Sequence, residues 1–284
     1  MIYDNSVAPI VKWVGGKRQL MPEIKKYIPE PNDISTYYEP FMGGGAVLFD
    51  LQPKKAVVND INSELINLYK VVKEDVESLI EELGSYKNEE SFYYKIRKLD
   101  RKLEIYEKLT DVQRAARIHY LNKTCYNGLY RVNQAGEFNT PFGKYKNPNI
   151  QNADTLRAVS KYFNKADIRF LSTDFEEAIK HCRREGFVYF DPPYDPVSDS
   201  ANFTGYAKGG FDRKEQIRLK KLCDKLDDRG VRFLLSNAYT DFIIDLYSDR
   251  DRDYRIETIQ AKRSINSNGD DRGEVDEVLV RNYG

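Results

Sequence analysis

Residues 36 to 49 read TYYEPFMGGGAVLF, and this stretch decides the fold. An aromatic-rich segment typical of a strand is followed by three glycines and then by the apolar start of a helix. Glycines allow a sharp turn and a close approach of the backbone to a ligand. The next apolar run, residues 56–58, ends in Asn59-Asp60-Ile61-Asn62. This order predicts a strand–helix–strand unit that binds a nucleoside, with Asp60 accepting hydrogen bonds from ribose hydroxyls.

Two simpler interpretations of this unit remain open. The glycines could only turn the chain, and Asp60 could cap the next helix, with Glu64 near the position of a capping partner. A phosphate-binding loop at Gly15-Gly16-Lys17 is rejected because the earlier glycine is missing at the required offset. Arg18 also stands where Ser or Thr would hold magnesium.

A second informative stretch is Asp191-Pro192-Pro193-Tyr194, which follows the apolar run FVYF at residues 187–190. The run predicts a buried strand that ends where the prolines begin. Two prolines remove two N–H donors and stiffen the chain, and they leave carbonyls beside a carboxylate and an aromatic ring. Such a site can accept hydrogen bonds from the amino group of a nucleobase while the ring stacks on the base. The alternative is a turn in which Asp191 is bonded locally.

Composition narrows the function classes. The chain has 284 residues and a net charge of zero, no apolar run near the ~18 residues of a membrane helix, and no signal-peptide pattern. Its three scattered cysteines and two isolated histidines have no metal-ligand spacing, so no metal site and a reducing cytosol are expected. Between residues 113 and 147, six basic residues are interleaved with aromatic ones and opposed by Glu137 alone. This pattern favours contact with DNA over a solvated face.

The organisation predicted from these patterns is an α/β nucleoside-binding sheet interrupted by a helical insertion. The catalytic domain spans residues 1–68 and 155–284, and the insertion spans residues 69–154. A helical pattern covers 65–121, a long ordered loop or hairpin covers 126–150, and strands are expected at 168–171, 231–235 and 275–283. A mobile loop is expected over 262–272.

Nearly the whole chain resembles the Dam-type DNA adenine-N6 methyltransferases, in which the loop for S-adenosylmethionine precedes the catalytic motif. The matching stretches are residues 12–17, 39–45, 59–62, 126–131, 137–143, 191–194, 202–206, 235–237 and 263–269. The resemblance implies an α/β, Rossmann-like methyltransferase sheet with an inserted helical DNA-recognition domain. It also implies S-adenosylmethionine as cofactor and double-stranded DNA as partner, with adenine flipped out of the helix. It implies that the catalytic residues are Asp191, Pro192, Pro193 and Tyr194. The cofactor-binding residues would be Trp13, Lys17, Phe41, Gly43, Gly45, Asp60, Asp174, Phe175 and Asp191.

For three of these residues a structural role is also open: Trp13 in the core, a solvated Lys17, and Asp174 as a helix N-cap. The family's recognition hairpin matches residues 126–145. The implied DNA-binding residues are Lys12, Tyr126, Asn127, Leu129, Arg131, Pro141, Lys144 and Tyr145, with Arg131 contacting a guanine. The implied site is GATC, although Lys144 and Thr140 stand where family members often have Arg and Val.

Alternatives are a cytosine-N4 or an rRNA guanine-N2 methyltransferase and, least favoured, a non-catalytic DNA-binding module. The first usually has Ser where this chain has Asp191, and the second generally lacks the insertion. We expect a cytoplasmic, DNA-associated enzyme that is a monomer or a weak dimer on DNA, with a cognate restriction endonuclease as a possible partner. A restriction, phage or solitary role fits the sequence equally well.

Overall fold

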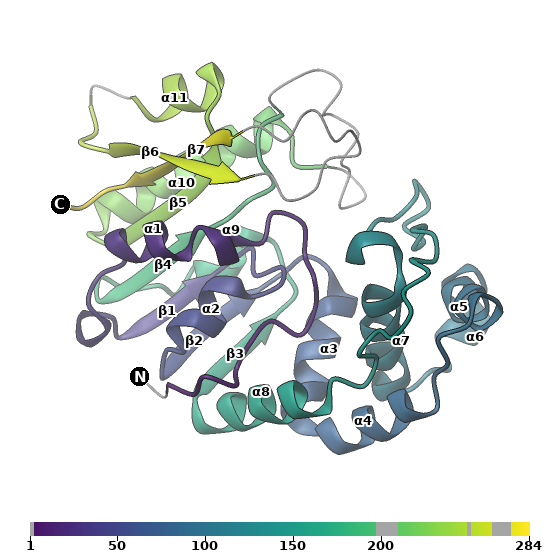
Figure 1. The fold of residues 1–284 in the computed structure, drawn as a ribbon. Helices are drawn as coiled ribbons and strands as arrows, with labels where there is room; N and C mark the ends of the chain where they lie inside the picture. Colours follow the sequence, from purple (N-terminus) through teal and green to yellow (C-terminus); the bar gives the residue numbers. More distant parts are fainter. Residues whose placement is uncertain (1–2, 197–209, 249–250, 263–273) are drawn as a thin grey trace.

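A computed structural model describes residues 3–196, 210–248, 251–262 and 274–284 of the chain (Figure 1). The matching stretches at 202–206 and 263–269, and the mobile loop expected over 262–272 except its first residue, lie outside the described residues.

A twisted sheet of seven strands organises the described residues, in the order β3-β2-β1-β4-β5-β7-β6. The first five strands of that order are parallel, and β7 is antiparallel to both β5 and β6. The strands are β1 (Thr36–Glu39), β2 (Lys55–Asn59), β3 (Asp167–Leu171), β4 (Gly186–Phe190), β5 (Arg232–Ala238), β6 (Arg255–Lys262) and β7 (Glu274–Arg281).

Side chains of alternate strand residues enter two cores, one on each face of the sheet. In β4, Phe187 and Tyr189 belong to one core, whereas Val188 and Phe190 belong to the other. Every residue of β4 is buried, as expected for a central strand that is covered on both faces. The second core is covered by α9 (Phe175–Ile179), α10 (Arg213–Asp228) and α11 (Asp241–Tyr247).

The first core continues from the sheet into a group of helices beside the β3 edge (Figure 1). Helix α3 packs on β3, α7 and α8, and α4 packs on α7 and α8. A capping box at Thr110 and Gln113 begins the long helix α7. The helices of this core are α1 (Met21–Ile24), α2 (Ala46–Leu51), α3 (Ser63–Glu74), α4 (Val76–Gly84), α5 (Glu90–Arg97), α7 (Asp111–Thr124) and α8 (Ala153–Lys165). The short helix α6 (Leu103–Tyr106) contributes no buried residue to it.

The predicted Rossmann-like α/β fold is confirmed by this doubly wound sheet. The strands expected at 168–171, 187–190, 231–235 and 275–283 form as β3, β4, β5 and β7, with bounds within three residues of the predicted ones. Strand β6 was not predicted, because its sequence RIETIQAK contains charged residues that mask the alternation of an edge strand. Among the described helices, none is long and apolar enough to cross a membrane.

Candidate active site

The carboxyl ends of three neighbouring strands bring the candidate residues together. Strand β1 lies between β2 and β4, and the chain leaves each of the three at the same edge of the sheet. The segments that follow are residues 40–45 after β1, residues 60–62 after β2 and residues 191–194 after β4. The strand order reverses between β1 and β4, which is where open α/β sheets bind ligands.

The glycine loop after β1 is shaped by contacts that its residue types permit. Gly43 has a φ of +48°, and a Cβ there would lie 2.6 Å from Trp13 Cδ1. Gly45, with a φ of +68°, ends the loop and caps α2. The Gly43 N–H donates to Asp60 Oδ2 at 2.9 Å, and the Tyr69 hydroxyl donates to the Gly43 carbonyl at 3.0 Å. The loop is therefore held to the end of β2 and to helix α3.

Asp60 does not cap helix α3, so that alternative is wrong. Asn62 is the N-cap, and its side chain accepts from the N–H groups of Glu64 and Leu65. Asp60 instead accepts from Asn62 N–H at 2.9 Å as well as from Gly43. Burial raises the pKa of the Asp60 carboxyl, although these two hydrogen bonds favour its charged form. A half-buried carboxylate with lone pairs remaining is suited to accepting hydrogen bonds from a diol.

Phe41 and Phe175 form an aromatic wall beyond the glycine loop, with ring centroids 5.3 Å apart. Asp174 caps α9 by accepting from Glu176 N–H at 2.9 Å, so its alternative role as an N-cap is present. The Asp174 carboxylate also forms an ion pair with Arg218, whose guanidinium lies 4.2 Å from the centre of the Phe175 ring.

Lys17 contacts the stretch Asp191-Pro192-Pro193-Tyr194 instead of lying in solvent. Its ammonium is 2.8 Å from Asp191 Oδ1 and 4.5 Å from the centre of the Tyr194 ring, and its side chain is only 3% exposed. Its Nζ also donates to the Gly15 carbonyl at 2.7 Å. The alternative of a solvated Lys17 is therefore wrong. Burial raises the pKa of Asp191 to about 6, and the Lys17 charge opposes that rise.

Tyr194 is fixed from the far side by Glu277 on β7, a residue that the sequence did not single out. The Tyr194 hydroxyl donates to Glu277 Oε2 at 2.7 Å. Burial, followed by the nearby charges of Asp191 and Glu277, raises the pKa of Tyr194 well above its ordinary value. The phenol therefore stays protonated and keeps donating to Glu277.

Two buried amide side chains hold the backbone at Pro193 and Asp195. Gln216 Nε2 donates to the Pro193 carbonyl at 2.8 Å, and Asn237 Oδ1 accepts from Asp195 N–H at 3.1 Å. The two amides are joined to each other at 3.0 Å. Asn237 belongs to one of the stretches that matched the family, whereas no local signal identified Gln216.

Glu39, at the end of β1, adds a buried carboxyl beneath the site. It accepts from the Tyr37 hydroxyl at 2.9 Å and is 2% exposed. Burial raises its pKa to about 8, and the hydrogen bond from Tyr37 opposes that rise. At neutral pH this carboxyl is therefore mostly neutral.

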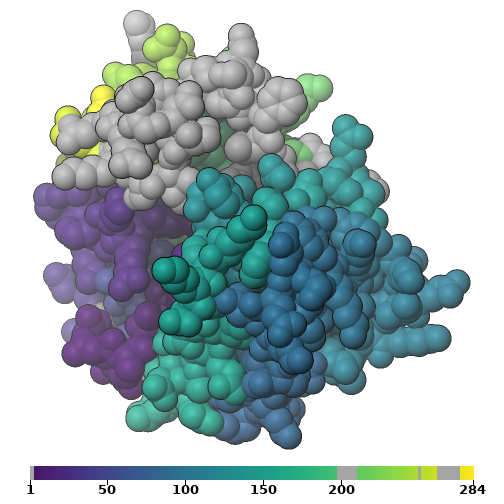
Figure 2. Space-filling model, turned by 45° about the vertical axis from the view of Figure 1, so that its right-hand side comes forward, coloured from purple at the N-terminus to yellow at the C-terminus, as the bar shows by residue number. Residues whose placement is uncertain are grey.

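The segment of residues 126–145 lies beside the N-terminal residues, as Figure 2 shows for the teal and purple parts of the surface. Trp13 stacks on Tyr130 at a centroid distance of 5.1 Å. Lys12 packs on Gly128, and its ammonium is 5.3 Å from the centre of the Tyr145 ring. The half-buried Trp13 thus contacts both the glycine loop and this segment, so it is neither wholly core nor wholly exposed.

The predicted DNA-binding residues on this segment are mostly at the surface. Arg131 is exposed, and its Nε donates to Asn139 Oδ1 at 2.7 Å. Leu129 and Tyr145 are half-buried, and the other exposed residues are Lys12, Tyr126, Asn127, Pro141 and Lys144. Asn127 and Lys144 have φ values of +55° and +54°, which fix the backbone direction at both ends of the segment.

Part of the basic character of residues 113–147 has a structural role. Arg114 is paired with Glu64 on α3, and Arg117 is buried and paired with Asp100 at 2.6 Å. The prediction that the basic residues face DNA therefore does not extend to these two arginines. Among the described residues no group of three or more His, Cys, Asp or Glu side chains is arranged to hold a metal ion.

Comparison with known proteins places this geometry in a family. The chain is 43% identical over 281 residues to the Type II methyltransferase M1.LlaDCHI of Lactococcus lactis subsp. cremoris, covering 98% of this chain and 96% of the relative. It is 44% identical over 295 residues to the Type II methyltransferase M.MjaIII of Methanocaldococcus jannaschii, covering 98% and 99%. It is 34% identical over 275 residues to the DNA adenine methylase of Escherichia coli K12, covering 95% and 93%.

The family itself follows from a match over most of the sequence. Residues 13–265 match the D12 class N6 adenine-specific DNA methyltransferases. This match confirms the resemblance and the prediction of an enzyme that methylates adenine N6 in DNA, in preference to a cytosine-N4 or an rRNA guanine-N2 methyltransferase or a non-catalytic module. The chain belongs to the D12 class of N6 adenine-specific DNA methyltransferases.

Proposed function

We propose that the enzyme moves a methyl group from S-adenosylmethionine to N6 of an adenine flipped out of duplex DNA, within the site GATC. The observation that carries this proposal is the joining of Asp191, Lys17 and Tyr194 beside the glycine loop and Asp60, at the ends of adjacent strands. A target amine and a methyl donor bound at these two places would lie side by side.

The residues at the glycine loop fit S-adenosylmethionine. Asp60 offers carboxylate oxygens to the ribose hydroxyls, and Phe41 with Phe175 offers an aromatic surface to the adenine of the cofactor. Gly43 and Gly45 would keep side chains out of the loop around the donor, and Trp13 and Lys17 would lie against its methionine end. Asp174 would contact the cofactor's adenine while its carboxylate also keeps the ion pair with Arg218. When bound, the cofactor supplies a methyl group already activated on a sulfonium.

The catalytic residues then act by position and charge. Asp191 and the Pro192 carbonyl would accept hydrogen bonds from the two N6–H groups, which directs the nitrogen lone pair toward the methyl carbon. After the transfer, the methylated amine loses one proton and becomes neutral. Tyr194 stacks on the flipped ring, and its bond to Glu277 holds the ring in one orientation. Positive charge grows on the amine during attack, so the carboxylate stabilises the transition state more than the ground state. The prolines keep Asp191 and Tyr194 at a fixed separation.

We further propose that residues 69–154 form the DNA-recognition insertion and that residues 1–68 and 155–284 form the catalytic domain. Arg131 would contact a guanine through two hydrogen bonds, and Lys12 would reach the other guanine. Leu129 and Pro141 would touch a thymine methyl group, and Tyr126 and Asn127 would lie next to the flipped adenine. Lys144 and Tyr145 would contact the phosphate backbone. Support comes from the exposure of Arg131, Tyr126 and Pro141 on one segment, which Trp13 links to the glycine loop by stacking on Tyr130 and packing on Gly43.

The setting is also part of the proposal. The relatives named Type II methyltransferases support a restriction endonuclease as cognate partner, whereas the relatives named DNA adenine methylase support a solitary role. We propose a cytoplasmic, DNA-associated enzyme that acts on each strand of the palindrome as a monomer or a weak dimer.

Transfer of labelled methyl groups tests the proposal. Duplexes that differ only in whether they contain GATC are incubated with the enzyme and labelled S-adenosylmethionine, and the modified base is identified after digestion. We expect N6-methyladenine only in the GATC duplex, and none with Asp191→Ala at unchanged thermal stability. Methylation of both duplexes refutes the site, and near-normal turnover by Asp191→Ala refutes the role of the carboxylate.

A further inference from the structure

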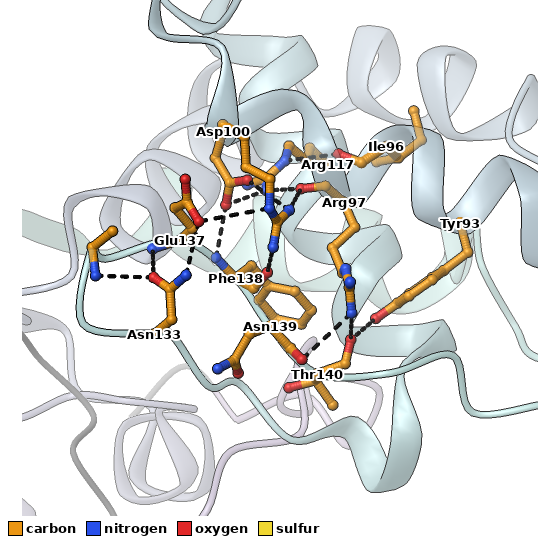
Figure 3. A network of polar contacts seen from close by, with 12 residues as sticks. Tyr93, Ile96, Arg97, Asp100, Arg117, Asn133, Glu137, Phe138, Asn139 and Thr140 are labelled. Carbon is orange, nitrogen blue, oxygen red and sulfur yellow. Dashed lines mark hydrogen bonds and ion pairs between the residues drawn. The ribbon is translucent and has the colours of Figure 1, made fainter.

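A buried polar network joins the 126–145 segment to helices α5 and α7 (Figure 3). Its centre is Asp100, in the 3₁₀ turn Lys98–Arg101 that follows α5. Asp100 Oδ2 is 2.6 Å from the buried guanidinium of Arg117 and accepts from Phe138 N–H at 2.8 Å. Arg117 in turn donates to the carbonyls of Ile96 and Arg97 at 3.1 and 3.0 Å.

The network supplies hydrogen-bond partners to backbone groups that a neighbouring strand would otherwise pair. The 126–145 segment folds back on itself, with Asn139 N–H donating to the Arg131 carbonyl at 2.9 Å and an antiparallel bridge between Val132 and Phe138. In such a pair, successive residues of the returning chain direct their backbone groups to opposite sides. Asn139 faces the outgoing chain, so the backbone groups of Phe138 and Thr140 need partners on the other side.

Side chains from residues 93–101 supply those partners. Phe138 N–H donates to Asp100, and the Phe138 carbonyl accepts from Arg101 Nη2 at 3.1 Å. The Thr140 carbonyl accepts from the Tyr93 hydroxyl at 2.8 Å and from Arg97 Nη1 at 3.1 Å. The N–H and carbonyl of Phe138 and the carbonyl of Thr140 are thus each fixed by a side chain 37 to 47 residues earlier in the sequence.

These anchors lie directly behind the residue proposed to read a guanine. Asn139 sits between the anchored residues Phe138 and Thr140, and its side chain accepts from Arg131 Nε at 2.7 Å. Asn133 closes the tip by accepting from the N–H groups of Ala135 and Glu137. The position of the Arg131 guanidinium therefore depends on a chain of contacts from Arg117 through Asp100 and Phe138 to Asn139.

We propose that Asp100 is a positioning residue for target recognition: it fixes the returning chain of the 126–145 segment, so that Arg131 meets one base in one geometry. This inference rests on the proposed function, because it takes the segment to be the part that reads DNA. A bidentate contact to guanine requires placement of both atoms at hydrogen-bonding distance, and a displaced backbone loses it without altering the methyl-transfer residues.

The test compares Asp100→Asn, Tyr93→Phe and Arg131→Ala with the control Glu77→Gln. Glu77 is a matched control because it also pairs with an arginine in the helical region, Arg157 at 2.7 Å, but lies at the surface on α4, outside the network. For each protein, kcat and KM are measured on a GATC duplex and on duplexes with the guanine replaced. Cofactor affinity and thermal stability are measured on the same samples.

Discrimination is the ratio of kcat/KM between the GATC duplex and a substituted duplex. We expect Asp100→Asn to lower it about tenfold, as the loss of one good base contact would. The KM for GATC duplex should rise, while kcat and cofactor affinity stay within about twofold. Tyr93→Phe should lower the ratio less, because Arg97 still donates to the Thr140 carbonyl. Glu77→Gln should leave the ratio unchanged. If Asp100 had only a structural role, Asp100→Asn would lower the stability of the protein without changing the ratio.

The outcomes separate this inference from the proposed function. If Asp100→Asn and Tyr93→Phe keep the wild-type ratio, the inference is overturned, whether or not Arg131→Ala loses it. If they lower the ratio while Arg131→Ala does not, the network positions the segment but the role given to Arg131 is wrong. If Asp100→Asn fails to fold, Tyr93→Phe decides alone, because it removes only one hydroxyl and keeps the ring.

Discussion

Replacing Lys17 with Met would remove the ammonium that lies 2.8 Å from the Asp191 carboxylate. Methionine has a similar length and keeps the packing, so the change acts mainly on charge. In the wild-type protein burial raises the pKa of Asp191 to about 6, and Lys17 limits that rise. The Asp191 carboxyl must be ionised to accept the hydrogen bond from N6 and to stabilise the positive charge that grows on the amine. The rate of methyl transfer should therefore rise with pH through this pKa.

The size of the effect follows from the distance. An opposite charge this close lowers the pKa of a carboxyl by about 1 to 3. Without Lys17 the pKa of Asp191 should therefore lie at about 7 to 9. At pH 7.5 the ionised fraction would then fall from nearly complete to between about three-quarters and about 3%, which slows methyl transfer by up to about 30-fold. At pH above about 9.5 most of that loss should be recovered.

Single-turnover rates across the range from about pH 5 to 10 measure this effect, with cofactor and DNA saturating so that binding does not limit the rate. Lys17→Arg keeps the charge and should keep the midpoint of the profile, and Arg18→Ala, an exposed neighbour, should match wild type. A Lys17→Met enzyme with an unchanged midpoint, or a loss that alkaline pH does not recover, would refute the assignment of Lys17 as the group that keeps Asp191 ionised.

Glu39→Gln should stabilise the protein at alkaline pH, because the pKa of buried Glu39 is about 8 in the fold and about 4.5 in the unfolded chain. Between those values the fold retains a proton that the unfolded chain has lost, so stability falls as pH rises; denaturant unfolding should show the variant gaining a few kcal/mol at pH 8 and nothing near pH 4. Equal curves at both pH values would contradict a buried neutral carboxyl. Gly43→Ala should weaken cofactor binding at least tenfold and lower stability by about 1–3 kcal/mol, since a Cβ would lie 2.6 Å from Trp13 Cδ1 at a φ of +48°. Calorimetric titration with cofactor that gives a wild-type affinity would argue against this loop as the donor site.

The sequence predicted the parts of the site that depend on local conformation. Two local effects are visible without the fold. Glycine widens the range of backbone conformations at positions 43 and 45, and proline narrows it at positions 192 and 193. The end of an apolar strand then places Asp60 and Asp191 at one edge of the sheet.

Residues whose roles depend on distant partners could not be predicted in this way. Glu277 is 83 residues from Tyr194, and Asp100 is 38 residues from Phe138. Neither has a neighbouring motif that marks it, and both appear in the sequence as ordinary charged residues. Lys17 could be read as solvated because its partner Asp191 lies in a distant part of the chain. The sequence pattern groups Arg117 with the DNA-facing cations, because the packing against α5 that buries it is not visible in the sequence.

Within a chain whose net charge is zero, two local arrangements of opposite charge have different tasks. At the strand ends, Asp60 and Glu277 are carboxylates, while Asp191 is compensated by Lys17 and Glu39 is mostly neutral near pH 7. This excess of negative charge suits a cationic donor and an amine that becomes positive as it reacts. On the 126–145 segment, exposed Arg131 and Lys144 suit phosphates and base edges. Trp13, which packs on Gly43 and stacks on Tyr130, joins the two arrangements, so a substitution that disturbs this ring should alter both recognition and chemistry.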